Sequence, residues 1–479
     1  MTASFLFYDL ETFGACARRS RIAQFAGIRT DSKLEQIDDE ISFFVKPADD
    51  LLPSPMAAVI TGITPQHAFA HGVNEAEAFA RIHEQMMRPG TCTAGYNSLR
   101  FDDEFVRHGL FRNFYDPYER EWRGGNCRWD LLDVMRLAHA LRPDGINWVY
   151  REDGTPSFTL EGLSAANGVR IGDAHEALSD VRALIGLSQR LRAAQPRLWE
   201  YALKLRDKRF AGSLLDVAAM TPVLHISQRF PASRLCAAPV IPLAMHPRIG
   251  NRVIVYDLVQ DPEPLLTLDP AAIAERLYVR QDALPPGVER VALKEVHLNR
   301  CPALIAWNHL RDADIERLRI DVDRVERHAE RIRVSAGEIA EKVRRVFAAT
   351  LDRGASDLDA SLYDGFLPDA DRLRFSDVRG TPPQHLGDTD FGLTDARLPE
   401  LLFRYRARNW RDSLRDDERD RWNAFRRERL ADLARSEYTF DTFFDEVRTL
   451  RAERGGDVRV AGLLDAVEAW GRELHAELA

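Results

Sequence analysis

The sequence predicts a multidomain protein of mixed α/β (α+β) class. Short runs rich in aromatic and β-branched residues, at 4–8, 22–29 and 41–46, predict strands near the N-terminus. Apolar residues then recur with helical spacing, first at 74–88. Strands followed by helices are typical of an α+β domain. Because the chain has 479 residues, we expect two or three domains.

The first domain is expected to end near residue 195. After the helix at 74–88, the segment TCTAGY at 91–96 predicts a short strand. Helical periodicity then returns in four segments, at 101–110, 130–141, 159–167 and 176–193. This alternation completes the expected α+β domain.

The rest of the chain consists of two regions with different residue patterns. From about 220 to 300, short β-like runs alternate with Pro- and Gly-rich turns, which predicts a small β-barrel or sheet. Beyond 311 the sequence is rich in Arg, Glu, Leu and Ala and predicts helices, with one interruption at 364–396. We therefore expect three domains, over 1–195, 196–350 and 351–479.

Composition predicts a cytoplasmic protein without a membrane segment. Hydrophobic residues make up 45% and charged residues 29%, which is ordinary for a globular chain. No apolar run approaches the roughly 20 residues that span a bilayer, and the N-terminus has no export signal. The five cysteines are odd in number and form no CxxC pair, which predicts reduced thiols. The net charge of −9 does not decide about nucleic acid, because binding needs only a local positive surface.

Asp9 and Glu11 are the first candidate functional residues. They lie two positions apart at the end of a predicted strand, so alternation places both carboxylates on one face. Hard oxygen ligands of this kind suit Mg²⁺ or Mn²⁺. A solvated strand end is the ordinary explanation of such a pair when it stands alone.

Asp102 follows the next predicted strand, where the chain turns into a helix. A carboxylate there could also serve the helix dipole, and Asp103 and Glu104 compete for any functional role. We favour Asp102 because it follows Phe101, an apolar residue that can anchor its neighbour towards the core.

His175 and Asp180 complete the candidate site. His175 precedes a predicted helix and Asp180 lies in its second turn. A histidine that titrates near pH 6.5 can act as a base around neutral pH. Four carboxylates and one base are the groups that metal-assisted phosphodiester hydrolysis requires.

The order of these motifs resembles the DEDDh exonuclease superfamily, and within it bacterial exonuclease I. The resemblance rests on DxE, YNxxxFD and HxxxxD, and on segments spread over nearly the whole chain, which are ITGITP, FYDPY, RWDLLDVMR, ALRPDGINW, HLNRCP and LLFRYRARN. It implies a ribonuclease H-like exonuclease domain, an SH3-like β domain and a C-terminal helical domain.

The resemblance also implies an activity, which is processive 3′→5′ hydrolysis of single-stranded DNA to 5′-mononucleotides, in DNA repair and recombination. Two Mg²⁺ ions, with Mn²⁺ as an alternative, would be held by Asp9, Glu11, Asp102 and Asp180. His175 would take the proton of the attacking water. The last two domains would arch over the strand and keep it bound.

The resemblance implies contacts with the DNA strand at several positions, which together offer positive charge and aromatic faces. They are Glu11, Arg107, Tyr118, Trp122, Arg136, Thr159, His297, Asn299 and Arg300. The chain departs from the best-known member at Thr159, where that member has arginine, so a phosphate contact there loses its charge. An aromatic core with solvated arginines remains the structural alternative.

The resemblance implies one protein partner, the acidic C-terminal tail of the single-stranded-DNA-binding protein. Arg142, Tyr201, Arg311 and Arg333 resemble its pocket, in which arginine would bind the terminal carboxylate. We expect the chain itself to be a monomer.

Two other functions are weighed against this one. An RNA-trimming or proofreading DEDDh exonuclease would share the carboxylates, but such chains lack the material after residue 200. A non-catalytic DNA-binding protein would not need all five residues of the candidate site, and all five are present.

Overall fold

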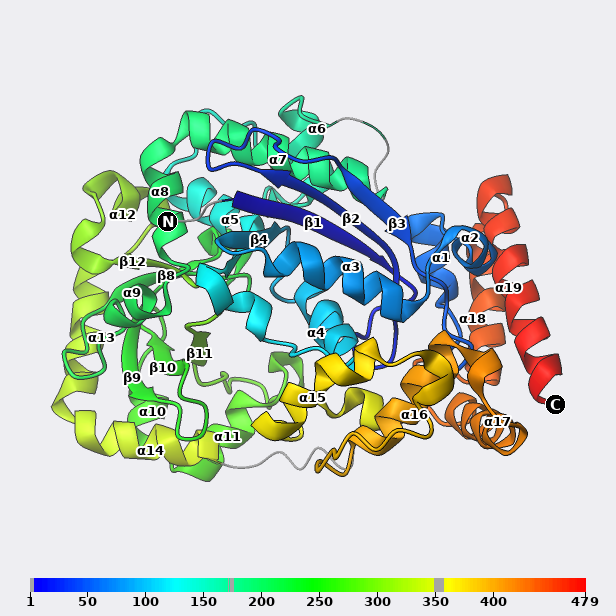
Figure 1. Cartoon of the computed structure of the whole chain (residues 1–479). Coiled ribbons are helices and arrows are strands. Elements are labelled where there is room, and N and C mark those ends of the chain that lie inside the picture. The colour runs from blue at the N-terminus through cyan, green and yellow to red at the C-terminus, as the bar shows by residue number, and fades with distance from the viewer. Residues whose placement is uncertain (1–3, 171, 173–175, 349–356) are drawn as a thin grey trace. The chain divides into compact units, whose positions relative to one another are not determined.

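The computed structural model describes residues 4–170, 172, 176–348 and 357–479 (Figure 1). It divides into two units. Unit 1 comprises Met1–Cys127, Arg170–Ile185 and Arg353–Ala479, and unit 2 comprises Arg128–Val169 and Gly186–Asp352. This division does not test the predicted boundaries of 1–195, 196–350 and 351–479, which stay a prediction. No helix in the described part of the chain is long and apolar enough to cross a membrane.

The sheet of unit 1 is built on β1 (Ser4–Thr12), which is buried along nearly its whole length. β1 pairs antiparallel with β2 (Ile22–Thr30) and parallel with β4 (Thr91–Gly95). β3 (Ile41–Phe44) pairs antiparallel with β2, so these strands lie in the order β3-β2-β1-β4. All four strands were predicted, because aromatic and β-branched side chains fit a buried pleated surface.

Alternation along β1 separates the core face from the functional face. Leu6, Tyr8 and Leu10 pack into a core formed with α3 (Glu75–Met87) and α4 (Asp102–Arg112). Since successive side chains of a strand point to opposite faces, Asp9 and Glu11 face away from this core. The sheet thus holds two carboxylates on a rigid element.

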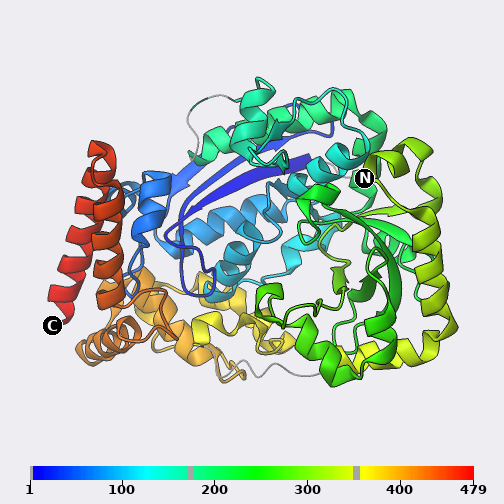
Figure 2. The same ribbon diagram turned by 180° about the vertical axis from the view of Figure 1, so that it is seen from behind.

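Two short helices that the sequence did not predict lie between β3 and α3. They are α1 (Pro55–Thr61) and α2 (Pro65–His71), and each begins with proline after a capping Ser54 or Thr64. α1 contacts both C-terminal helices, α18 (Phe440–Arg454) and α19 (Val458–Leu478), and α2 contacts α19. These two long helices run side by side in both Figure 1 and Figure 2.

The predicted interruption at 364–396 is partly wrong. α15 (Asp369–Gly380) lies within it, followed by α16 (Leu398–Asn409) and α17 (Asp416–Leu430). The Gly and Pro content of this segment indicated a break, yet Pro368 just before α15 and Gly380 at its end are compatible with the helix between them. The interior of α15 contains neither residue.

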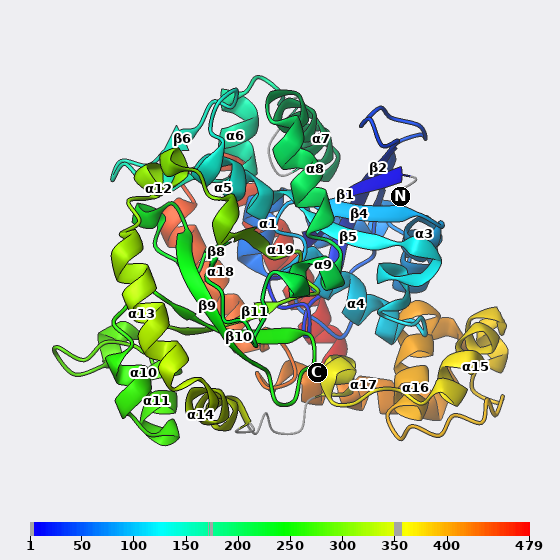
Figure 3. The same ribbon diagram turned by 90° about the vertical axis from the view of Figure 1, so that its left-hand side faces the viewer.

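Unit 2 contains an antiparallel sheet in the order β11-β10-β9-β8-β12. This confirms the predicted β region. Helices α11, α13 and α14 pack on the sheet through a shared core, and Figure 3 shows α13 and α14 beside β9 and β10. The strands are β8 (Val223–Ile226), β9 (Ala237–Met245), β10 (Arg252–Asp257), β11 (Leu293–His297) and β12 (Ala303–Ala306).

The remaining elements complete the chain. They are β5 (Cys127–Asp130), α5 (Leu131–Leu141), β6 (Val149–Tyr150), β7 (Pro156–Ser157), α6 (Leu160–Ala166), α7 (Ala177–Ala194), α8 (Pro196–Lys204), α9 (Lys208–Ser213), α10 (Glu263–Thr267), α11 (Pro270–Leu277), α12 (Asp312–Leu318), α13 (Val322–Val334) and α14 (Ala336–Ala348). The helices predicted at 130–141, 159–167 and 176–193 are therefore confirmed.

A buried ion cluster joins the N-terminal and C-terminal parts of unit 1. Asp359 is fully buried and pairs with Arg404 at 3.3 Å and with Arg408 and Arg429 at 2.5 Å. Arg408 also reaches Asp50 at 2.8 Å. Burial by itself raises the pKa of Asp359, but the charges of these three arginines and of Arg21 outweigh it and hold the pKa well below its usual range.

Asp359→Ala should destabilise unit 1 strongly. The change leaves the three buried guanidinium groups without their shared carboxylate, and removing one partner of a buried ion pair costs about 3–5 kcal/mol. Thermal unfolding followed by circular dichroism should show a lower melting temperature. Asp364→Ala, on the exposed side of the same segment, is the matched control and should melt like the wild type. Equal melting temperatures for the two variants would contradict the role given to Asp359.

Candidate active site

Three carboxylates form a cluster, two of them on β1 and one on α7. One carboxylate oxygen each from Asp9, Glu11 and Asp180 lies within 4.8 Å of the others. Asp9 and Glu11 are held by the pairing of β1 with β2, where they lie opposite Ala26 and Gln24. Asp180 comes from the first turn of α7, so residues far apart in the sequence meet here.

Asp102 and Asp103 begin α4 and have different surroundings. Asp103 is 1% exposed and accepts hydrogen bonds from the Tyr8 hydroxyl at 2.7 Å and from Arg120 Nη2 at 2.6 Å. Asp102 lies close enough to the cluster for its charge to raise the pKa of both Asp9 and Glu11. That Asp102 rather than Asp103 is the functional carboxylate stays a prediction. The hydrogen bonds of Asp103 with Tyr8 and Arg120 support it, because they give Asp103 a structural role.

The electrostatics of the cluster favour a cation. Burial, and then the charges of Asp102, Glu11 and Asp180, hold the pKa of Asp9 well above its usual range. Burial together with Asp180 and Asp102 raises the pKa of Glu11 to about 8. After burial, the cause of both shifts is the repulsion of neighbouring like charges, and a bound divalent cation would offset that repulsion. The donor set, all carboxylate oxygens, fits Mg²⁺ or Mn²⁺.

Two further residues concern this site, which are Arg170 and the predicted base His175. Arg170 Nη2 donates to Asp180 Oδ1 at 2.8 Å, and sequence reasoning missed this arginine because no motif marks it. His175, the predicted base, lies outside the described residues.

The predicted DNA contacts of unit 1 differ in how accessible their side chains are to a ligand. Arg107 is buried, pairs with Glu121 at 2.7 Å and lies 5.4 Å from the ring centre of Tyr118. Trp122 is 64% exposed, so its ring is accessible for stacking. Arg107 thus has a structural partner, whereas Trp122 presents an open aromatic face.

Tyr118 also lines a cavity of about 420 Å³ together with Tyr363 and Phe366. Phe366 is 95% exposed, and the Tyr363 hydroxyl donates to Glu104 at 2.6 Å. Sequence reasoning missed both aromatic residues. The spacing of Tyr363 and Phe366 within LYDGF was the available signal.

Of the predicted DNA contacts of unit 2, Arg136 lies within α5, and the others lie at or beside the ends of elements. Arg136 donates to Asp133 at 2.6 Å, and the Thr159 hydroxyl caps α6 by accepting from the main-chain nitrogen of Gly162. His297 ends β11, and Asn299 and Arg300 follow in the turn before β12. Thr159 therefore has a local structural role that does not need charge.

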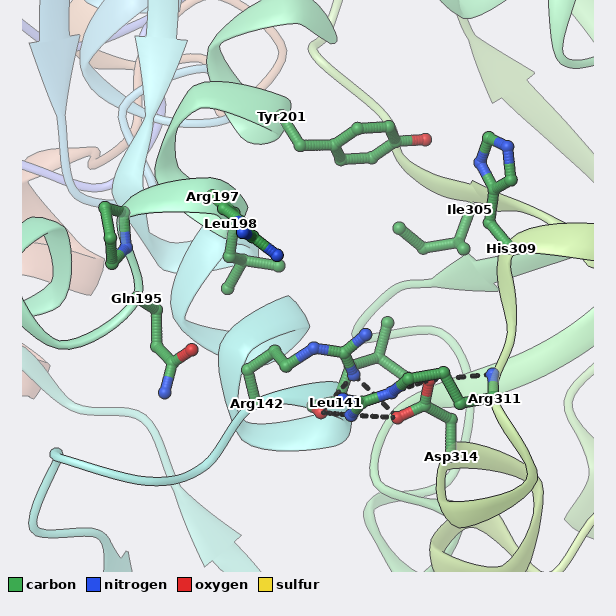
Figure 4. Close-up of a pocket in the computed structure, with 11 residues that line it drawn as sticks. Leu141, Arg142, Gln195, Arg197, Leu198, Tyr201, Ile305, His309, Arg311 and Asp314 are labelled. Atoms are coloured by element: carbon green, nitrogen blue, oxygen red, sulfur yellow. Dashed lines mark hydrogen bonds and ion pairs between the residues drawn. The ribbon is translucent and has the colours of Figure 1, made fainter.

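A pocket of about 520 Å³ in unit 2 contains three of the four residues predicted to bind a partner. Arg142 and Arg311 donate to Asp314 at 2.6 Å and 2.9 Å, as Figure 4 shows. Tyr201 lies across the pocket from them in Figure 4. Arg333, the fourth predicted residue, is not among the described residues lining this pocket and donates to the main-chain oxygen of Met220.

Comparisons with known proteins identify the family over nearly the whole chain. The family models described as Exonuclease, Exonuclease I SH3-like domain and Exonuclease I C-terminal domain match residues 6–187, 206–349 and 356–474. Exodeoxyribonuclease I of Escherichia coli K12 is 43% identical over 473 residues, which cover 98% of each chain. Exodeoxyribonuclease I of Haemophilus influenzae is 40% identical and covers 89% of this chain and 90% of its own.

Solved structures agree with these relatives. Exonuclease I from Methylocaldum szegediense has a TM-score of 0.94 and 47% identity, and covers 98% of this chain and 99% of its own. E. coli exonuclease I in complex with a dA16 oligonucleotide has a TM-score of 0.94 and 43% identity, with 98% and 100% covered. Two further structures, each at 42% identity, are described as the zinc ion bound form of an E. coli exonuclease I complex with single-stranded DNA and as SSB/exonuclease I in complex with an inhibitor.

These similarities confirm the predicted fold class and the resemblance to bacterial exonuclease I. The relatives and the family models together span the exonuclease, SH3-like and C-terminal regions. The chain belongs to the exodeoxyribonuclease I family.

Proposed function

We propose that this enzyme is a processive 3′→5′ exodeoxyribonuclease that hydrolyses single-stranded DNA to 5′-mononucleotides by a two-metal-ion mechanism. The observation that carries the proposal is the cluster of Asp9, Glu11 and Asp180, whose oxygens lie within 4.8 Å of one another. The oligonucleotide bound to E. coli exonuclease I supports the choice of substrate.

Asp9, Glu11, Asp102 and Asp180 would hold two Mg²⁺ ions, with Mn²⁺ as an alternative. When bound, the ions supply the positive charge that acidifies a water molecule and stabilises the leaving 3′ oxygen. Three of the four carboxylates come from β1 and α4, which fix their positions before substrate arrives. The protein's contribution is therefore mainly positioning and charge.

Other side chains would act on the proton and on the strand. His175, which lies outside the described residues, would take a proton from the attacking water. Trp122 is exposed and would stack on a base. The remaining proposed contacts are Glu11, Arg107, Tyr118, Arg136, Thr159, His297, Asn299 and Arg300.

We place the enzyme in the cytoplasm as a monomer with a role in DNA repair and recombination. The three-domain division into 1–195, 196–350 and 351–479 is also part of the proposal. The family-model matches at 6–187, 206–349 and 356–474 support this division.

Asp9→Asn should abolish hydrolysis while the fold is kept. The change removes the charge of one proposed ligand, and a catalytic metal contributes several kcal/mol to the transition state, so we expect a loss of roughly a thousandfold or more. The measurement is a time course on 3′- and 5′-labelled single-stranded DNA, with and without Mg²⁺, beside labelled RNA of the same sequence.

Asp39→Asn is the matched control, because Asp39 is an exposed carboxylate outside the cluster. It should keep the wild-type rate. Retained turnover by Asp9→Asn with Mg²⁺ would refute the metal assignment, and faster loss of RNA than of DNA would refute the substrate.

Asp102→Asn and Asp103→Ala should fail in different ways. Asp102→Asn should lose hydrolysis at an unchanged melting temperature. Asp103→Ala should lower the free energy of unfolding by about 3–5 kcal/mol, because it leaves buried Arg120 without its carboxylate. Parallel measurements of rate and melting temperature separate the two. A stable Asp103→Ala without activity, beside an active Asp102→Asn, would exchange their roles.

A second part of the proposal concerns a partner, the acidic C-terminal tail of the single-stranded-DNA-binding protein. The pocket of unit 2 offers the guanidinium groups of Arg142 and Arg311 and an apolar wall that includes Leu198 and Ile305. Arginine binds carboxylates through charge-assisted hydrogen bonds, and the wall would take the last side chain. The solved structure described as SSB/exonuclease I supports this choice.

Arg311→Ala should weaken binding of a labelled peptide from that tail by roughly tenfold or more, because it removes a charge-assisted hydrogen bond. Fluorescence anisotropy gives the dissociation constant. Amidating the peptide's C-terminus should weaken binding to the wild type more than binding to Arg311→Ala. Arg324→Ala, an exposed arginine on α13, is the control and should bind normally. An unchanged dissociation constant for Arg311→Ala would contradict the assignment.

A further inference from the structure

Arg170 is a cation in contact with the carboxylate cluster. Its Nη2 lies 2.8 Å from Oδ1 of Asp180, and the two side chains are 12% and 14% exposed. Both residues belong to unit 1. The contact is therefore a largely shielded ion pair rather than a solvated surface pair, and water screens it only weakly.

The position of this ion pair matters because Asp180 belongs to the cluster. Asp9, Glu11 and Asp180 bring carboxylate oxygens within 4.8 Å of one another, a distance at which like charges repel appreciably inside a protein. A guanidinium group bound to one of the three offsets part of that repulsion. Arg170 thus supplies positive charge at the place where a divalent cation would supply it.

A guanidinium and a divalent cation are poorly compatible on the same carboxylate oxygen. A bound Mg²⁺ or Mn²⁺ sits about 2 Å from its ligand oxygen, so Nη2 at 2.8 Å from that oxygen would leave two positive charges within roughly 5 Å. The repulsion between them opposes simultaneous binding. Arg170 itself belongs to no strand or helix and follows α6 in the chain.

We propose that Arg170 and the divalent cation compete for Asp180, so that Arg170 is an internal counter-cation that metal binding displaces. The proposal rests on the metal site given above for Asp9, Glu11 and Asp180. Its consequence is that Arg170 weakens metal binding and raises the metal concentration that the enzyme needs.

Arg170→Gln should therefore bind metal more tightly than the wild type. The probe is Mn²⁺ alone, added to full-length protein that has been freed of metal with a chelator, and binding is followed by electron paramagnetic resonance. Because a partly shielded ion pair is worth about one factor of ten at most, we expect the dissociation constant to fall roughly 3–10-fold. Arg170→Lys keeps the charge and should lie between the two.

Thermal unfolding supplies a second readout that does not depend on catalysis. Without metal, Arg170→Gln should melt below the wild type because its carboxylates are less well neutralised. At a fixed Mn²⁺ concentration the melting temperature should rise more in Arg170→Gln than in the wild type, since tighter binding stabilises the folded state further.

Arg182→Gln is the matched control. Arg182 lies on α7 two positions after Asp180, but its guanidinium pairs with Glu40 rather than with the cluster. It changes the net charge of the protein by the same amount, so its Mn²⁺ dissociation constant should equal that of the wild type. An equal gain in Arg182→Gln would assign the effect to general charge and overturn the proposal.

Two other outcomes separate this inference from the metal site itself. Equal or weaker Mn²⁺ binding by Arg170→Gln would overturn the competition, and weaker binding would make Arg170 an orienting partner of Asp180. Asp9→Ala tests the site: if it binds Mn²⁺ as the wild type does, the proposed metal site is wrong whatever Arg170→Gln shows.

Discussion

The repulsion between buried carboxylates is the constraint on which the candidate site depends. Asp9 and Glu11 lie on one face of β1, and burial together with their acidic neighbours raises the pKa of both. Such groups stay together only if the backbone that carries them cannot relax. The pairing of β1 with β2 and β4 provides that rigidity, and the hydrogen bonds of Asp103 with Tyr8 and Arg120 hold the beginning of α4 against the same strand.

Unit 1 contains a second group of buried carboxylates with the opposite electrostatics. Asp359 and Asp50 are fully buried, but surrounding arginines hold the pKa of each well below its usual range. Their oxygens are taken by Arg404, Arg408 and Arg429. The contrast gives a physical criterion within one protein. Buried carboxylates surrounded by arginines stabilise the fold, whereas carboxylates whose pKa is raised by burial and by one another are suited to bind a cation.

Much of the fold could be predicted from local sequence patterns. The strands of unit 1 and the helices at 74–88, 101–110 and 130–141 follow from periodicity and residue type. α1 and α2 were missed although Ser54-Pro55 and Thr64-Pro65 are ordinary helix-start signals, because each helix is too short to show periodicity. α15 was missed because the Gly and Pro residues spread over 364–396 indicated a break in the helical pattern.

Only part of the candidate site could be predicted from the sequence, because some of its contacts are local and others are not. Alternation along a strand places Asp9 and Glu11 together, but no local pattern brings Asp180 to them or Arg170 to Asp180. Those contacts depend on the tertiary fold. The pocket of unit 2 shows the same principle in part, since Asp314 binds Arg142 across 172 positions of the sequence, whereas it binds Arg311 locally at the start of α12. In each place a side chain of opposite charge binds a residue of the proposed site: Arg170 binds Asp180, and Asp314 binds Arg142. Because a buried unpaired charge is costly, such internal partners let a site of one sign persist in the folded protein, and any ligand must bind better than the partner it replaces.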